Sequence, residues 1–184
     1  EQKIIYLYEA FKEYGYVEDQ WIICPENSEV FKVATEKGMN VISFPYKSEY
    51  DFKFAKQLSL ISKEKKADVI FVHSSQSHTM AVLSAMFYGL KVPLVLCRTL
   101  IRRVDTNFLR KWKYNYKGIK KIICVSEPVV NVLKFAVKDH SKLCVVGSVT
   151  DINKFNKQFI LPRFTNKYSF SFFYNCFSKT FYRW

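Results

Sequence analysis

The sequence predicts an α/β fold built on a doubly wound parallel sheet, and three observations lead to it. Six short apolar runs rich in β-branched residues recur along the chain, each bounded by proline, glycine or charged residues. Segments with apolar residues at helical spacing lie between these runs. The runs are apolar throughout, which is typical of strands buried on both faces. Strands that alternate with helices predict a parallel sheet with right-handed crossovers.

The expected strands are separated by four helical patterns. The strands occupy residues 20–24, 40–44, 68–72, 93–97, 121–125 and 143–147. The first helix carries Ile4, Tyr8 and Phe11 on one face and is closed by Gly15. A second helical pattern spans 54–61.

A third helix is expected over 81–88, with a start near Thr79 and an end at Gly89. A fourth starts at Ser126, a capping residue followed by Pro128 in the first turn. Together these elements predict a Rossmann-like domain over residues 1–155.

The opening strand of such a domain is missing from the sequence. A doubly wound sheet normally opens with a central strand, a glycine-rich turn and a helix, but here residue 1 already lies in the first helical pattern. We therefore expect an incomplete domain, because neighbouring strands would lose their backbone partners.

Residues 156–184 do not resemble a further domain. Eleven of the 28 residues from 157 onward are aromatic, without helical or strand periodicity. Two interpretations remain open: a poorly folded extension, which the weak periodicity favours, or an amphipathic segment that touches a membrane.

Composition points to an anionic partner. The 184 residues carry a formal net charge of +13, which suits phosphate-bearing substrates, anionic lipid or nucleic acid. No apolar run approaches the roughly 18 residues of a membrane span, and no signal peptide is apparent. The five cysteines form no CxxC pair, which indicates reduced thiols and no metal site. We expect a cytoplasmic protein, with a peripheral position on the inner face of the cell membrane as an alternative.

Polar residues follow three of the expected strands at their carboxyl ends, where open α/β sheets bind ligands. They are His73 with Ser74 to Ser77 and His78, then Arg98, Thr99, Arg102, Arg103 and Asp105, and finally Ser126 and Glu127. Imidazole, hydroxyl and guanidinium groups suit the hydroxyls and phosphates of a sugar-type ligand. Structural roles compete with this interpretation, because the serines can cap helices and His73 can bond a backbone carbonyl.

A basic run extends from residue 98 to 121. It holds nine lysines and arginines against Asp105 alone, with Phe108, Trp112, Tyr114 and Tyr116 interleaved. A solvated helix face and an anion-binding surface are both consistent with this pattern. The sequence contains no P-loop, GxGxxG, GxSxG or HExxH motif.

Five segments in order carry a family resemblance. These are EQK (1–3), KKADVIFVHSSQSH (65–78), LVLCRTLIRRVDTNFLRKWKY (94–114), IKKIICVSEPVVNVL (119–133) and KLCVVGSVTDINKF (142–155). The chain resembles the N-terminal, acceptor-side domain of family 4 glycosyltransferases, whose GT-B fold has two facing Rossmann-like domains. Two departures are the missing opening strand with its glycine turn, and the absence of a glycine directly before Asp151.

The resemblance implies transfer of a sugar from a nucleotide-sugar donor to a glycan or lipid-linked acceptor in polysaccharide biosynthesis. The nucleotide sugar is a co-substrate bound by a second domain, so no cofactor is expected and the chain should be inactive alone. Carried over by position, His73, Arg102, Arg103 and Ser126 would face the cleft near substrate phosphates, with Asp105 and Glu127 as weaker candidates. No catalytic residue is assigned.

Two other functions compete with sugar transfer. The first is a non-catalytic α/β domain that binds an anionic membrane or another anionic partner through the basic run. The second is binding of nucleic acid, which the pI near 9.5 permits. We consider nucleic acid an unlikely partner because no recognised binding module is present.

Overall fold

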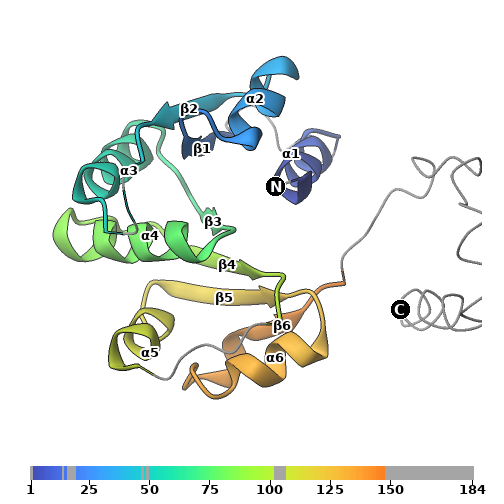
Figure 1. Ribbon diagram of the computed structural model, residues 1–184, viewed down its shortest axis with the longest axis vertical. Coiled ribbons are helices and arrows are strands. Elements are labelled where there is room, and N and C mark those ends of the chain that lie inside the picture. Colours follow the sequence, from blue (N-terminus) through green and yellow to red (C-terminus); the bar gives the residue numbers. More distant parts are fainter. Residues whose placement is uncertain are drawn as a thin grey trace, which may run out of the picture. The chain divides into compact units, whose positions relative to one another are not determined.

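A computed structural model describes residues 2–13, 15, 20–46, 48, 50–101 and 107–147 of the chain. The chain divides into a unit from Glu1 to Val145 and a unit from Val146 to Trp184. All described helices and strands belong to the first unit (Figure 1). The aromatic segment 156–184 lies outside the described residues.

The six expected strands are all present, with no end displaced by more than two residues. They are β1 (Ile22–Pro25), β2 (Val41–Phe44), β3 (Ile70–Val72), β4 (Leu94–Arg98), β5 (Ile119–Cys124) and β6 (Leu143–Val145). Every pairing between them is parallel. The strands form two sheets, β1-β2 and β3-β4-β5-β6, and no pairing joins β1 to β3 among the described residues. The α/β parallel fold is confirmed.

One helix precedes β1, and the other helices connect successive strands. They are α1 (Gln2–Glu13), α2 (Glu29–Glu36), α3 (Phe52–Glu64), α4 (Ser75–Phe87), α5 (Phe108–Tyr114) and α6 (Glu127–Leu133), with a 3₁₀ turn η1 (His140–Lys142) before β6. The side chains of Ser28, Asp51 and Ser74 cap α2, α3 and α4 by accepting a hydrogen bond from the first turn of each helix. Helix α2 has no counterpart among the four helical patterns named from the sequence.

Helix α4 begins four residues before its expected start near Thr79. Ser74 and Ser77 form a capping box, in which each side chain accepts from the backbone N–H of the other. This reciprocal bonding fixes the first turn at Ser75. The expected end is confirmed, because Gly89 takes the left-handed conformation (φ +67°) that favours glycine.

Helix α4 is buried along most of its length. Seven consecutive residues from His78 to Ser84 are buried, so the helix is surrounded on all sides and shows no single apolar stripe. It packs against α3 and lies close to β3 and α5. Apolar residues of α4, the helix at the centre of the fold, therefore show little helical periodicity in the sequence.

The main core lies on β3 to β6. Leu94, Leu96, Ile119 and Ile122 have at most 1% of their surface exposed, and they pack with α3, α4 and α6 residues. A second core joins α1 and α2 to β1 and β2. A third joins α3 to α4. These cores hold the carboxyl ends of β3, β4 and β5 next to one another.

We expect Leu96→Ala to lower the free energy of unfolding by about 3 kcal/mol, because it leaves a cavity in the main core. Urea unfolding followed by circular dichroism would measure the change. Leu60→Ala is the matched control, since Leu60 is 50% exposed on α3, and it should change stability by less than about 0.5 kcal/mol. Equal losses in the two variants would contradict the assigned core.

Candidate functional site

The carboxyl ends of β3, β4 and β5 bring together three of the polar positions that follow strands. His73 directly follows β3, Arg98 is the last residue of β4, and Ser126 is two residues beyond β5. Pairing aligns these ends, because Val72 lies opposite Leu96 and Arg98 lies opposite Cys124. The backbone N–H of Val125 also donates to the Arg98 carbonyl at 3.1 Å.

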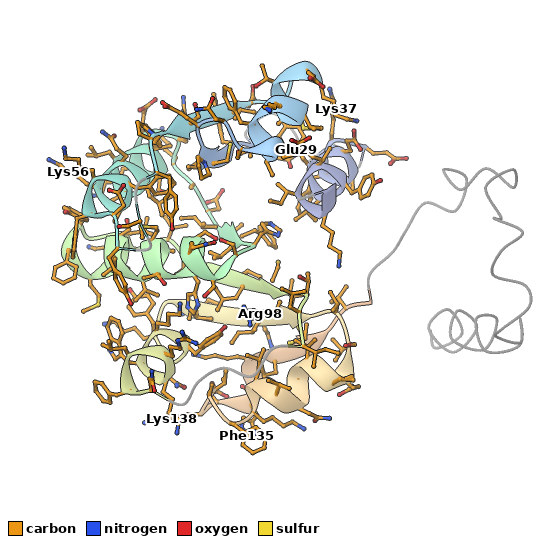
Figure 2. The ribbon with its side chains drawn as sticks, in the orientation of Figure 1. Glu29, Lys37, Lys56, Arg98, Phe135 and Lys138 are labelled. Atoms are coloured by element: carbon orange, nitrogen blue, oxygen red, sulfur yellow. The ribbon has the colours of Figure 1, made fainter. Side chains whose placement is uncertain are left out.

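Arg98 is the cation at the centre of this edge. Its side chain is half-buried, and its guanidinium lies 5.9 Å from the ring centroid of Tyr114. Its Nε atom is buried and has no hydrogen-bond partner within the described part of the chain. Figure 2 shows Arg98 among the strands, whereas the labelled Lys56 and Lys138 lie at the periphery. A buried guanidinium N–H without an acceptor suits a phosphate or carboxylate ligand.

His73 provides an imidazole directly after β3, the strand that pairs with β4. The side chain is half-buried, and burial lowers the pKa of His73 below its usual range. The ring is consequently neutral at physiological pH and can both accept and donate a hydrogen bond. Such a group suits a sugar hydroxyl.

Ser126 stands at the N-cap position of α6 but does not cap the helix with its side chain. Its backbone is extended (φ −163°, ψ 160°), and its hydroxyl makes no capping hydrogen bond. The interpretation of Ser126 as a side-chain N-cap is therefore wrong, although Ser126 does occupy the N-cap position and is half-buried. Glu127 occupies the first turn of α6 and is exposed.

His78 and the serines after β3 have structural roles. The capping box uses Ser74 and Ser77. His78 is 2% exposed, its Nε2 lies 3.1 Å from the Lys113 carbonyl oxygen, and its ring packs edge-on against Tyr114. Burial, with the nearby charge of Lys113, lowers the pKa of His78 to about 3. A neutral, enclosed imidazole of this kind holds α4 against α5.

Arg98 and Lys113 are not among the residues that the family resemblance implies for the site. The sequence indicates Arg98 only as one of the polar residues at a strand end. Lys113 is buried, and its ammonium donates to the Thr79 hydroxyl at 2.9 Å and to the Ser75 carbonyl at 3.3 Å. A lysine in a basic run gives no signal of burial. Arg102, Arg103 and Asp105 lie outside the described residues.

The cysteines of this region are protonated thiols. Burial raises the pKa of Cys97 and the pKa of Cys124 to about 11, so neither is a thiolate nucleophile at neutral pH. Among the described residues, no three histidine, cysteine or acidic side chains are grouped in a way that could hold a metal ion.

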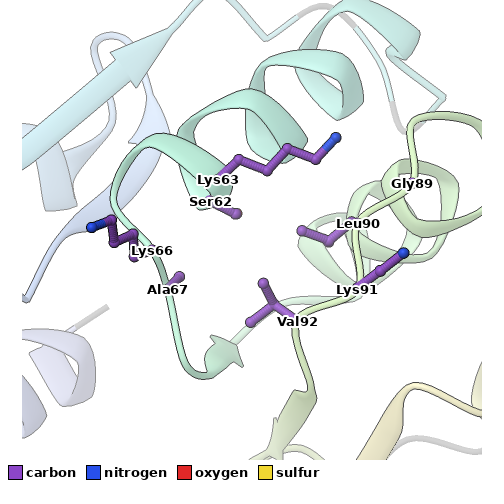
Figure 3. Close-up of a pocket in the computed structure, with 8 residues that line it drawn as sticks. All are labelled: Ser62, Lys63, Lys66, Ala67, Gly89, Leu90, Lys91 and Val92. Atoms are coloured by element: carbon purple, nitrogen blue, oxygen red, sulfur yellow. The ribbon is translucent and has the colours of Figure 1, made fainter.

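A pocket of about 330 Å³ lies at the opposite edge of the sheet (Figure 3). It is formed where α3 and α4 end, before β3 and β4 begin, and is lined by Ser62, Lys63, Lys66, Ala67, Gly89, Leu90, Lys91 and Val92. Open α/β sheets bind ligands beyond the carboxyl ends of their strands, so this amino-end pocket is separate from the candidate site.

A doubly wound parallel domain with hydroxyl, imidazole and guanidinium groups at its carboxyl edge defines a binding domain for phosphorylated or polyhydroxylated ligands. The sequence matches the family model of Glycosyltransferase Family 4 over residues 5–154. The chain therefore belongs to glycosyltransferase family 4.

Two solved structures share this fold. A glycosyltransferase from Rickettsia africae ESF-5 superposes with a TM-score of 0.65 at 18% identity, over 95% of this chain and 44% of the other. Anabaena Alr3699/HepE, solved in complex with UDP and glucose, gives a TM-score of 0.59 at 12% identity, over 80% of this chain and 41% of the other. The chain thus spans less than half the length of either relative. No curated protein matches it.

The depressed pKa of His78 predicts a loss of stability in acid. Because the folded-state pKa of about 3 lies below the unfolded value of 6.5, the unfolded state binds an extra proton between these values. The contribution of the neutral His78 imidazole to the free energy of unfolding is fully present above pH 6.5. It is lost as the pH falls toward 3, and the loss is roughly 2 kcal/mol at pH 5. Urea unfolding should show that the free energy of unfolding of the parent chain falls between pH 7 and pH 5. The fall should be smaller by about 2 kcal/mol in His78→Gln. Identical losses would contradict the buried neutral imidazole.

Proposed function

We propose that this chain is the acceptor-side half of an enzyme that transfers a sugar from a nucleotide-sugar donor to a glycan or lipid-linked acceptor. The observation that carries the proposal is the carboxyl edge of β3, β4 and β5, where His73, Arg98 and Ser126 meet in a domain of family 4 type. Neutral donors and acceptors at His73 and Ser126 suit sugar hydroxyls, and Arg98 suits a phosphate.

The donor would bind outside this chain. HepE was solved with UDP and glucose, which favours a uridine diphosphate sugar as the donor type. Since this chain covers under half of each solved relative, we assign the donor contacts to a second domain. Arg102 and Arg103, which follow β4 in the sequence, are further candidates for the phosphates.

Sugar transfer requires the acceptor hydroxyl and the anomeric carbon to be held at reacting distance, with the leaving phosphate stabilised electrostatically. A domain that holds only the acceptor can neither position the anomeric carbon of the donor nor stabilise its leaving phosphate. The isolated chain should consequently bind acceptor phosphates and transfer no sugar.

We expect the chain to bind farnesyl diphosphate, a soluble prenyl diphosphate, more tightly than farnesol, because Arg98 can pair with the diphosphate. Isothermal titration calorimetry should show affinity at least about tenfold lower in Arg98→Met, which corresponds to loss of a charge-assisted hydrogen bond. Arg98→Lys, which keeps the charge but not the planar donors, is the matched control. Its affinity for farnesyl diphosphate should lie between those of the parent chain and Arg98→Met.

Equal affinity for farnesol and farnesyl diphosphate, or an unchanged Kd in Arg98→Met, would contradict a phosphate role for Arg98. Radiolabelled UDP-glucose incubated with the same preparation should give no labelled product. Transfer by the isolated chain would overturn the assignment of the donor site to another domain.

Helix α5 supports a second proposal, contact with an anionic membrane. Its arrangement is inverted relative to an ordinary surface helix, because Lys113 and Tyr114 are buried while Phe108, Leu109 and Trp112 are exposed. Phe108 is 81% exposed and Leu109 is 64% exposed. Phe108 and Trp112 lie four residues apart, on one face of the helix. We name Phe108, Leu109 and Trp112 the α5 patch.

Charge around the α5 patch favours an anionic lipid surface. Nine lysines and arginines fall between residues 98 and 121, with Asp105 as the single acidic residue. Leu100 and Ile101, before α5, are also exposed. Apolar side chains that enter the headgroup region among basic residues are typical of peripheral membrane contacts. No described helix is long and apolar enough to cross a bilayer, so such contact would be interfacial. It would place a lipid-linked acceptor close to the carboxyl edge.

Phe108→Glu should weaken binding to phosphatidylglycerol-containing vesicles about tenfold or more, since it removes an inserted aromatic ring and adds a negative charge. Vesicle sedimentation at low and high salt would measure the effect, and high salt should weaken binding of the parent chain. Phe135→Glu is the control, because Phe135 is 77% exposed on the segment after α6. Similar losses in both variants, or equal binding to pure phosphatidylcholine, would exclude the α5 patch as the contact.

A further inference from the structure

The amino-end pocket is built by the ends of two packed helices. Helix α3 ends at Glu64 and α4 ends at Phe87, and the lining residues fall within the segments 62–67 and 89–92. The volume of about 330 Å³ lies at the small end of the range for ligand pockets, roughly 300–1,000 Å³. The pocket is therefore large enough for a small organic molecule.

The floor of the amino-end pocket is apolar. Figure 3 shows the side chains of Ala67, Leu90 and Val92 directed into it, together with that of Ser62. The Ser62 hydroxyl donates to the Leu58 carbonyl at 2.6 Å, so its proton is already used. These four side chains offer no donor to a sugar hydroxyl. The floor consequently suits an apolar group, in contrast to the carboxyl edge.

Three lysines surround this apolar floor. Lys66 and Lys91 lie on opposite sides of it, and Lys63 extends from the last turn of α3 (Figure 3). All three are exposed, and none forms an ion pair within the described part of the chain. A charged rim around an apolar floor suits an anion that also carries an apolar part.

Acidic neighbours leave an excess of positive charge at the rim. Of the described residues that line the pocket, none is acidic. Glu64 is next in sequence, but its carboxylate lies 3.1 Å from the Lys65 ammonium. Asp68 is exposed after the second lining segment of α3, and its single charge is set against the three lysines. Exposed ammonium groups in such excess raise the local concentration of anions.

Lys66 occupies a backbone conformation that favours glycine. Its φ is +49°, and at the end of α4 the residue with a comparable φ, +67°, is Gly89. The Lys66 N–H donates to the Lys63 carbonyl at 3.1 Å and so closes α3. A glycine would make the same bond with less strain. Helix termination therefore does not account for a lysine side chain at this position, whereas a ligand at the rim does.

We propose that the amino-end pocket binds a small organic phosphate with an apolar carbon part, such as an aromatic ring. The ring would lie on Ala67, Leu90 and Val92, and the phosphate would lie among the ammonium groups. Lys66 directs its ammonium outward in Figure 3, and its flexible stem allows the charge to move over a bound phosphate. The proposal does not depend on sugar transfer, because the pocket and the candidate site lie at opposite ends of the strands.

The test is an NMR titration of the isotope-labelled full chain, in which the amide signals of Ala67 and Gly89 report on the pocket. Phenyl phosphate should shift both signals saturably, with a Kd of about 1 mM. Phenol lacks the charge and inorganic phosphate lacks the ring, so each should bind at least about tenfold more weakly. High salt should weaken the binding of phenyl phosphate, because it screens exposed charges.

Substitutions at the rim test the role of the lysines. Lys63→Met and Lys91→Met should each raise the Kd about threefold, and the double variant about tenfold, as expected for exposed and independent charges. Lys56→Met is the matched control, since it removes an exposed lysine of α3 that does not line the pocket. Lys56→Met and Arg98→Met should both leave the Kd unchanged.

Lys66→Gly separates a binding role from a structural one. Glycine relaxes the left-handed backbone, so the urea midpoint should be unchanged or higher, whereas the Kd for phenyl phosphate should rise about threefold. Lysines that act only on the helix dipole would change the midpoint and leave the Kd unchanged. An unchanged Kd in Lys66→Gly, Lys63→Met and Lys91→Met would overturn the proposal.

Three further outcomes would also overturn it. The first is the absence of saturable shifts at Ala67 and Gly89, or equal affinity for inorganic phosphate, which would indicate an adventitious ion only. The second is an equal loss of affinity in Lys56→Met and Lys91→Met, which would show attraction to net charge alone. The third is a set of shifts at the carboxyl edge that disappears in Arg98→Met. That result would assign the ligand to the candidate site and leave the proposed function intact.

Discussion

Parallel pairing is the constraint on which this structure depends. Each connection between parallel strands must return across the sheet through a helix, so all strand ends of one kind lie at the same edge. The candidate ligand groups, His73, Arg98 and Ser126, are consequently together although more than fifty residues separate the first from the last. The same constraint places the lysine-lined pocket at the opposite edge, where it plays no part in the proposed chemistry.

Sequence patterns were sufficient for features set by local composition. The strands are continuous apolar runs, and glycines mark the ends of α1 and α4, so element type and order followed directly. Features set by tertiary contact could not be predicted from the sequence. The buried helix α4 has no clear apolar face, Ser126 occupies a cap position without using its hydroxyl, and Lys113 is enclosed inside a basic run. The environment of the Arg98 guanidinium depends on Tyr114, sixteen positions away, and so has no local signal in the sequence. Candidates Arg102, Arg103 and Asp105 fall in the segment that the structure does not describe.

Burial of polar groups links the interior of the domain to its site. Lys113 enters the fold to bond Thr79 and Ser75, and the charge it brings favours the neutral form of His78. These contacts attach α5 to α4 from within, which leaves the aromatic side of α5 directed outward. The exposed Phe108 and the buried Lys113 are thus two results of one helix orientation. A single rotation of α5 would bury the α5 patch and expose the cation.

The interruption of the sheet has a consequence for how the chain folds. Strands β3 to β6 pair in sequence order, and β1 pairs with β2, so each half contains contacts between neighbouring segments of the chain. Contacts of short sequence separation form quickly, whereas side-chain contacts between the two halves, such as that of Phe11 with Phe71, join segments far apart in the chain. Two halves of low contact order would then form early and independently. Whether they melt as one body or as two depends on these non-local side-chain contacts.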